Sequence, residues 1–374
     1  MEGGGGGNVE VMAAAKKEAR RRRVERVALP GVMVMVQVFT VVTMLMSKVT
    51  LTAGMHPLVL LVYRNLVAAA VVAPLAIIFE RDMLKKLNLV ALGWISINAT
   101  FGVLLAMGLY YCGLRVTNAT YAVDFINLIP VATFLIAVLL RAERLSLTDR
   151  PGRTKLLGAA AGVAGTMVVS LCKGTHLLLP HLRPSSQANT VAVVHHGHDM
   201  VVGTLFLIGS CVSYALWFVV QARVAMVFPS RYWATTLTCA VGSLQSAAAA
   251  AVAVAYSGAD ANGGWSAWRL RWDMQLATVV YSGVFNTGVT FVLVSWAVAR
   301  RGPVYPPMFN SLSLIGTTVV DAVVLGTDVY LGGVLGAALV IVGLYAFLWG
   351  KGKELAAAKE QELQRGDVDD GSMA

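Results

Sequence analysis

Charged residues are scarce in this sequence, and their scarcity excludes an ordinary soluble domain. Asp, Glu, Lys and Arg make up 13% of the 374 residues, whereas soluble domains carry about 25%. Hydrophobic residues reach 57%, and the mean hydropathy is +0.69. The composition therefore predicts an all-α protein that crosses a membrane several times.

Motifs for covalent chemistry are also lacking. The four cysteines lie in or beside apolar runs without CxxC spacing, which is typical of buried structural thiols. No Walker motif, GxSxG, HExxH or paired-carboxylate cluster stands in a context that supports catalysis. We interpret the histidine-rich HHGHD (195–199) as a solvated loop rather than a metal site. We therefore expect no enzyme, no cofactor and no bound metal.

Long apolar runs are what the sequence has instead. A membrane-spanning helix needs about 20 predominantly apolar residues, and ten runs approach or reach this length. They lie at 28–49, 56–79, 89–112, 117–140, 156–173, 200–222, 232–256, 277–298, 304–325 and 329–349.

The basic residues are unevenly placed between these runs. Of 30 Lys and Arg, 23 fall in segments that we assign to one side of the membrane and six on the other side or at its edge. Such asymmetry is the positive-inside rule, and it predicts that both termini are cytoplasmic. It also accounts for the net charge of +10 without a nucleic-acid partner.

The ten runs divide into two sets of five, separated by a long polar connection. An odd number of spans in each set predicts that the second set is inverted relative to the first. DFINLIP (124–130) resembles MFNSLS (308–313), and LGAAAG (157–162) resembles LGGVLG (331–336). The expected organisation is a basic tail (1–27), a first five-helix repeat (28–173), an extracytoplasmic linker (174–199), a second five-helix repeat (200–350) and a charged cytoplasmic tail (351–374).

Two charged residues lie inside apolar runs, where burial is costly. An aspartate at the bilayer centre costs about 2.5–3.5 kcal/mol on an insertion scale. Asp124 shares its run with Asn127 and Pro130, and Arg64 lies in the second run at a similar expected depth. The two charges are candidates for a substrate or coupling site. A structural ion pair, or an arginine that reaches outward to the interface, are the alternatives.

Uncharged polar residues lie near the middle or inner third of several runs. Individually, such side chains often hydrogen-bond neighbouring helices at a gain of about 0.6 kcal/mol. Together they are drawn from both sets of five, as the lining of a central cavity would be. The candidates are Gln37, Asn127, Gln245, Asn286 and Asn310.

The order of several short motifs resembles the plant nodulin-like EamA-domain transporters, which include the "walls are thin" proteins and the "usually multiple acids move in and out" transporters of the drug/metabolite transporter superfamily. The matching stretches extend from about Pro30 to Glu354. They are GMHPLVLLVYRN (54–65), NLIPVATF (127–134), RAERL (141–145), GSCVSYALWFVVQARV (209–224), SWAVARRGPVY (295–305) and LGGVLGAALVIVGLYAFLWGKGKE (331–354).

This resemblance implies a ten-helix carrier for amino acids, or for auxin or another small organic acid, in the plasma membrane or the vacuolar membrane. Its expected partners are the substrate and the lipid bilayer, and a homodimer is compatible with the sequence. Ser311 and the pair Thr327-Asp328 depart from the family pattern, which leaves substrate choice open. A channel is the alternative from another class, although no ring of like charges or filter loop supports it.

Overall fold

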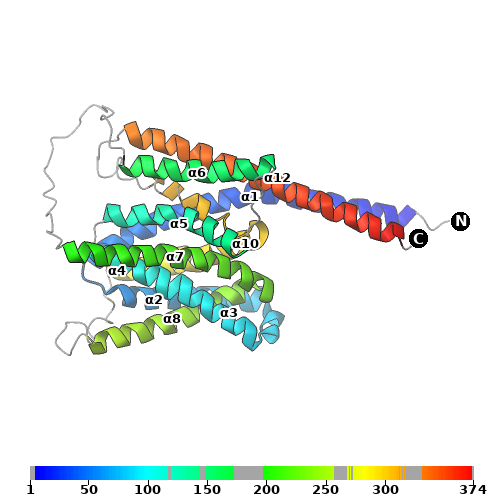
Figure 1. The fold of residues 1–374 in the computed structure, drawn as a ribbon. Coiled ribbons are helices and arrows are strands. Elements are labelled where there is room, and N and C mark those ends of the chain that lie inside the picture. The colour runs from blue at the N-terminus through cyan, green and yellow to red at the C-terminus, as the bar shows by residue number, and fades with distance from the viewer. Residues whose placement is uncertain are drawn as a thin grey trace.

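The structure is a computed structural model that describes residues 5–116, 119–142, 149–171, 197–256, 268, 270, 273–310, 312–313, 315–316 and 331–372. Every regular element within these residues is helical. The helices lie side by side in one bundle, and α1 and α12 continue beyond it at the end where both termini lie (Figure 1). The all-helical class expected from composition is confirmed.

The elements follow one another in the order of the expected apolar runs. The first set comprises α1 (Gly5–Thr52), α2 (Pro57–Phe79), the 3-10 helix η1 (Arg81–Lys86), α3 (Leu89–Ala99), the π-helix η2 (Thr100–Met107), α4 (Gly108–Val116), α5 (Ala119–Leu139) and α6 (Arg150–Leu171). The second set comprises α7 (Gly197–Val227), α8 (Arg231–Tyr256), α9 (Met274–Tyr281), the π-helix η4 (Ser282–Val289), α10 (Thr290–Arg301), the 3-10 helix η5 (Pro307–Phe309) and α12 (Leu331–Ser372).

Seven helical segments among the described residues are long and apolar enough to cross a membrane. They are Val27–Leu51, Pro57–Phe79, Leu89–Leu114, Val201–Val227, Arg231–Val252, Met274–Arg301 and Val334–Glu354. Helices α5 and α6 coincide with the fourth and fifth expected runs but are not among the seven. Of the ninth run, 304–325, residues 311, 314 and 317–325 fall outside the described residues. The expected count of ten stays a prediction.

Local sequence signals set several helix ends. The His56 imidazole accepts a hydrogen bond from the Leu58 amide at the start of α2, and Pro57 occupies the first helical position. Asn88 caps α3 by accepting from the Ala91 amide at 2.7 Å. Gly302 ends α10 with a φ of 89°, a left-handed conformation that glycine adopts without strain.

The helices pair in a pattern that relates the two sets. α2 packs along α8, and α6 packs along α12. α7 contacts α3, η2 and α4, while α1 contacts α9, η4 and α10. If each run is numbered by its order in the chain, the pairs are second with seventh, fifth with tenth, sixth with third and first with eighth. Exchanging the two sets leaves this pattern unchanged.

Glycines allow α6 and α12 to approach very closely. A Cβ added at Gly158 would lie 2.4 Å from the Phe347 amide nitrogen, and one at Gly343 would lie 2.4 Å from the Gly162 nitrogen. Such backbone contact is typical of helices with small residues at spacing four. Gly158 and Gly162 belong to the LGAAAG stretch and stand four residues apart, which is this spacing.

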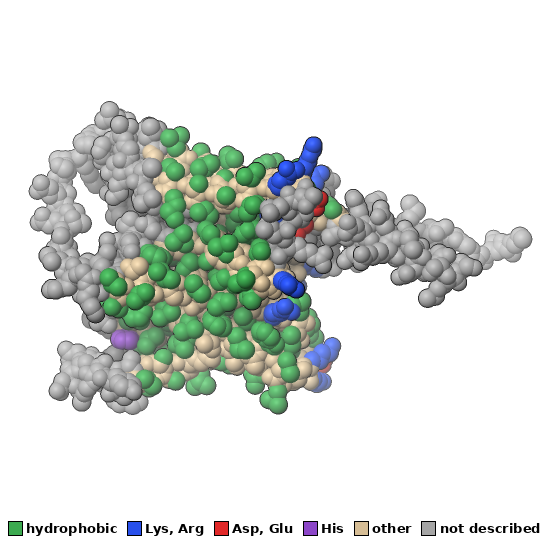
Figure 2. Space-filling view, in the orientation of Figure 1, with side chains coloured by type: hydrophobic (Ala, Val, Ile, Leu, Met, Phe, Trp, Pro, Cys, Tyr) green, Lys and Arg blue, Asp and Glu red, His purple; other side chains and the backbone are tan. Residues whose placement is uncertain are grey.

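One end of the bundle collects the exposed basic side chains, and we call it the basic end (Figure 2). It includes Arg81 and Lys86 of η1 together with Arg300 of α10, all exposed. Figure 2 shows hydrophobic side chains covering the side of the bundle away from this end. An apolar wall with a charged rim is the surface that a membrane protein presents to lipid and water.

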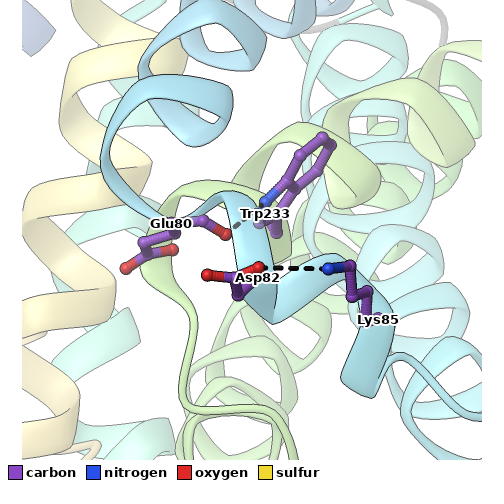
Figure 3. Close-up of polar contacts among 4 residues, drawn as sticks. All are labelled: Glu80, Asp82, Lys85 and Trp233. Carbon is purple, nitrogen blue, oxygen red and sulfur yellow. Dashed lines mark hydrogen bonds and ion pairs between the residues drawn. The ribbon is translucent and has the colours of Figure 1, made fainter.

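Glu80 joins two helices at the basic end. Its carboxylate accepts hydrogen bonds from the Ser230 hydroxyl and from the Tyr232 amide, and its backbone oxygen accepts from the Trp233 indole at 3.0 Å (Figure 3). The carboxylate thus lies at the N-terminus of α8, where the helix dipole favours negative charge. These contacts tie the end of α2 to the start of α8.

Candidate functional site

Arg64 is the one charged residue of α2, and it is buried. The residues spaced by four along this helix, Leu60, Arg64, Ala68 and Val72, are all buried, so the arginine lies on the face that packs into the bundle. Only 2% of its surface is exposed. The guanidinium therefore does not reach the interface, and the snorkelling alternative is wrong.

The three guanidinium nitrogens each donate to a different residue. Nε donates to the Thr287 hydroxyl at 2.6 Å, Nη1 to the Tyr111 hydroxyl at 3.2 Å and Nη2 to the Met107 sulfur at 3.2 Å. Thr287 belongs to π-helix η4, whereas Met107 belongs to η2 and Tyr111 to the following α4. Arg64 thus bridges the two π-helices, one from each set of five.

All three partners are neutral, and no described carboxylate forms an ion pair with Arg64. A buried cation without an anion carries a large desolvation penalty. The described surroundings therefore offer hydrogen bonds to the guanidinium but no counter-charge.

A second set of polar side chains lies on α1, η4 and the segment after η5, and η4 also carries the Arg64 partner Thr287. The Thr40 hydroxyl of α1 donates to the Asn286 side chain at 3.2 Å, and the Gln37 amide donates to the Asn310 side chain at 3.5 Å, which is long for a hydrogen bond. Asn286 and Thr287 are consecutive in the π-helix. One contacts α1 and the other contacts Arg64, so η4 links the two polar groups.

Trp217 supplies a buried donor near the same place. Its indole nitrogen has no hydrogen-bond partner among the described residues. The ring packs over Gly102 of η2, where an added Cβ would lie 2.4 Å from the indole nitrogen, and it makes an edge contact with Tyr214 at 6.3 Å between centroids. An unpaired buried donor is costly, and polar groups of this kind often face a ligand or water.

Comparison with known proteins assigns the chain to a family. The sequence model of the EamA-like transporter family matches residues 30–171 and again residues 201–349. This chain belongs to the EamA-like transporter family. It is therefore a membrane transporter of small solutes, as the family resemblance implied.

Several plant proteins are similar to this EamA-like transporter over most of its length. WAT1-related protein At5g07050 of Arabidopsis thaliana is 35% identical over 83% of this chain and 77% of its own length. WAT1-related protein At5g64700 is 35% identical over 85% and 89%, and Protein WALLS ARE THIN 1 is 32% identical over 85% and 82%. The resemblance to this plant group, within the drug/metabolite transporter superfamily, is confirmed.

A solved structure described only as "Crystal structure of protein" shares the fold of this transporter. The two superimpose with a TM-score of 0.59 over 86% of this chain and 97% of that chain, at 17% sequence identity. At that identity the likeness supports the fold alone.

Four of the seven predicted site residues make hydrogen bonds between helices in the described structure: Arg64 and Asn286 with contacts to or from η4, and Gln37 of α1 with Asn310. Gln245 of α8 makes a separate contact. Its amide donates to the Thr100 hydroxyl of η2 at 3.0 Å and to the Ser96 carbonyl of α3 at 3.4 Å. Asp124 and Asn127 lie on α5, but their side chains fall outside the described part of the chain. The Arg64–Asp124 pair stays a prediction.

Sequence reasoning missed the residues that hold Arg64. Thr287 follows a predicted site residue directly, and this neighbourhood was the only available signal. Tyr111 and Met107 look like ordinary members of an apolar run. Among the described residues, no group of three or more His, Cys, Asp or Glu side chains could hold a metal ion.

Proposed function

We propose that this protein is a secondary carrier for small organic solutes that bear a carboxylate, with amino acids as the first candidates. The proposal rests on Arg64, whose guanidinium is buried and whose described partners are all neutral. A substrate carboxylate would supply the missing negative charge, and it fits the planar donor fork of arginine in two parallel hydrogen bonds.

The remaining predicted residues complete the proposed site. Asn286, Gln37 and Asn310 bind the polar body of the substrate. Asn286 directly precedes the Arg64 partner Thr287 on η4 and contacts Thr40 of α1, and Gln37 of the same α1 contacts Asn310. Gln245 acts on the opposite π-helix through Thr100. Asp124 and Asn127 of α5 stay predicted members of this site, with Asp124 as the candidate to bind an amino group or to carry a coupling proton.

We propose that the carrier has ten helices in two inverted repeats of five, in the domain boundaries expected from sequence. Three observations support this arrangement. The family model matches twice in one chain. Four helix pairs, α2–α8, α6–α12, α3–α7 and α1–α10, map onto one another when the two sets are exchanged. A π-helix of eight residues interrupts both the third and the eighth run, and π-helical segments cluster at functional sites.

In this proposal substrate binding and alternating access share the same contacts. Arg64 donates to Thr287 in one repeat and is held by Tyr111 and Met107 in the other. A carboxylate that takes guanidinium donors weakens these links between the repeats. The halves then rearrange around the bound substrate, as in other inverted-repeat carriers.

Auxin or a similar aromatic acid is the second candidate substrate. The arginine partner Tyr111 belongs to a buried cluster that also contains the aromatic rings of Trp217 and Phe291. Such rings favour an aromatic body over a small polar one, and the Trp217 indole would donate to the substrate.

The test is uptake and efflux in oocytes, using a labelled amino-acid mixture beside labelled indole-3-acetic acid. We expect saturable flux that Arg64→Gln reduces at least about tenfold, since a charge-assisted pair contributes about 1.5–3 kcal/mol. Arg64→Lys keeps the charge but loses the fork and should retain part of the flux. The control Arg81→Gln removes an exposed arginine of η1 and should change nothing. Equal flux in the two glutamine variants would refute the role of Arg64.

We place the carrier in the plasma membrane, with the vacuolar membrane as the alternative, and both termini in the cytoplasm. The gathering of basic side chains at the end where both termini lie supports this orientation (Figures 1 and 2).

A further inference from the structure

Helix α6 exposes a stripe that changes from cationic to apolar along its length. Arg150, Arg153, Leu157, Ala160 and Ala164 are all exposed, and their spacing of three and four residues places them on one face of the helix. The two arginines lie in the first turn, at the basic end. Beyond them the exposed residues of this face, Leu157, Ala160 and Ala164, are apolar, and Leu157 is 68% exposed.

Helix α12 repeats this profile in the opposite chain direction. Ile341, Tyr345, Trp349 and Lys353 are exposed at intervals of four residues. The Lys353 ammonium lies 5.9 Å from the centroid of the Trp349 ring, and Tyr345 is 72% exposed. Exposed Trp and Tyr beside a basic residue are typical of the level at which lipid headgroups meet the hydrocarbon.

The exposed cations of this helix pair are not neutralised by the described carboxylates. Glu354 is already shared by two buried lysines, Lys155 at 2.7 Å and Lys351 at 3.7 Å. No ion pair within 4.0 Å joins Arg150, Arg153 or Lys353 to a described carboxylate. The acidic Asp149, exposed just before α6, is the other described carboxylate at this end of the pair.

The interior of the pair is closed to a ligand. The glycine contacts bring the two backbones so close that a Cβ at Gly350 would lie 2.8 Å from the backbone amide nitrogen of Lys155. Any ligand of these cations therefore binds on the outer surface of the pair, where the apolar stripes begin.

We propose that the basic end of the α6–α12 pair binds an anionic phospholipid. Its phosphate lies at Arg150, Arg153 and Lys353, and its acyl chains lie along the apolar stripes of the two helices. The charge and the hydrophobicity of this lipid both match the surface. Its phosphate neutralises the cations, and its acyl chains cover the exposed Leu157 and Tyr345. Basic sites between transmembrane helices near the cytoplasmic face bind lipid phosphates in this way.

The experiment measures lipid selectivity of the full-length protein in phosphatidylcholine vesicles that contain a minor fraction of phosphatidylglycerol. Spin-labelled versions of both lipids give the association constant of phosphatidylglycerol relative to phosphatidylcholine. We expect the unmodified protein to prefer phosphatidylglycerol. The variant R150Q/R153Q/K353Q should lose at least about fivefold of this preference, because each cation near an anionic headgroup contributes about that factor.

The matched control is R81Q/K85Q/K86Q in η1, which removes three exposed cations from the same end of the molecule. Its preference should stay within about twofold of the unmodified protein. Equal losses in the two triple variants would assign the preference to general surface charge and overturn the site. So would the absence of any preference in the unmodified protein, or displacement of the spin-labelled lipid by soluble glycerol phosphate. If the first triple variant fails to fold, the double variant R150Q/R153Q decides the same question.

Discussion

At the scale of single residues, the Thr287 hydroxyl makes the shortest of the described hydrogen bonds of the buried Arg64. It accepts from Arg64 Nε at 2.6 Å. Thr287→Val keeps the shape but leaves a buried charged donor unpaired, which costs about 1–3 kcal/mol. We expect a loss of that size in the free energy of unfolding in lipid nanodiscs, together with a raised KM for uptake. Thr287→Ser, which keeps the hydroxyl, should restore both.

Thr290 provides the control for this substitution. Its hydroxyl, at the start of α10, donates to the Phe285 carbonyl of the preceding η4 at 3.0 Å. Thr290→Val therefore removes a local bond but no contact of Arg64, and its KM should match that of the unmodified transporter. A KM raised equally by both valine variants would show that Thr287 does not act through the arginine.

Glu80 gives a second prediction at this scale. Its carboxylate accepts from the Ser230 hydroxyl and the Tyr232 amide at the start of α8. Glu80→Gln removes the negative charge from the helix N-terminus and weakens both contacts, at a cost of about 1–2 kcal/mol. Thermal unfolding measures this loss.

The neighbouring Asp82 is the matched control for Glu80. It pairs with Lys85 at 3.3 Å, but the two side chains are 87% and 81% exposed (Figure 3). Exposed ion pairs contribute little, so Asp82→Asn should leave the unfolding temperature unchanged. An equal shift in both variants would mean that only net charge matters at this end.

At the scale of helices, the α6–α12 contact depends on which glycine is substituted. A Cβ at Gly158 would meet the Phe347 nitrogen at 2.4 Å, whereas one at Gly162 would meet only the Met308 methyl at 3.9 Å. Gly158→Ala must separate the helices and should cost about 1–3 kcal/mol. Gly162→Ala gains helix propensity, about 0.5–1 kcal/mol, and should be neutral or stabilising. Similar unfolding temperatures for both would contradict the close approach.

The two π-helices should be energetically coupled through Arg64. Thr287 of η4 and Tyr111, which follows η2, both accept from its guanidinium. A double-mutant cycle with Thr287→Val and Tyr111→Phe should therefore give a coupling energy of about 0.5–3 kcal/mol, as found for groups that share a partner. The control cycle replaces Tyr111→Phe by Thr50→Val, since Thr50 pairs with Thr278 and not with Arg64. A coupling near zero in the first cycle would refute the bridge.

At the scale of the whole molecule, hydropathy alone located most helices, because a bilayer demands long apolar segments. The expected runs 56–79 and 232–256 differ by one residue from α2 and α8. The π-helices were not predicted, since i to i+5 bonding leaves no mark on hydropathy and depends on contacts such as Gly102 against Trp217. The same limit applies to the site. Charge inside an apolar run indicated Arg64, but its neutral partners come from distant segments that only the fold brings together.

The last prediction concerns how the chain lies across the membrane. If the two sets of five are inverted, the linker 174–199 lies on the side opposite the termini. An epitope tag inserted near residue 190 should then resist protease added to the cytoplasmic side, while a tag after residue 374 should be digested. Both termini lie at one end of the bundle (Figure 1). Because five spans separate the N-terminus from the linker in this arrangement, the two tags should differ in accessibility. Digestion of both would place the linker beside the termini, which an odd number of spans per set forbids.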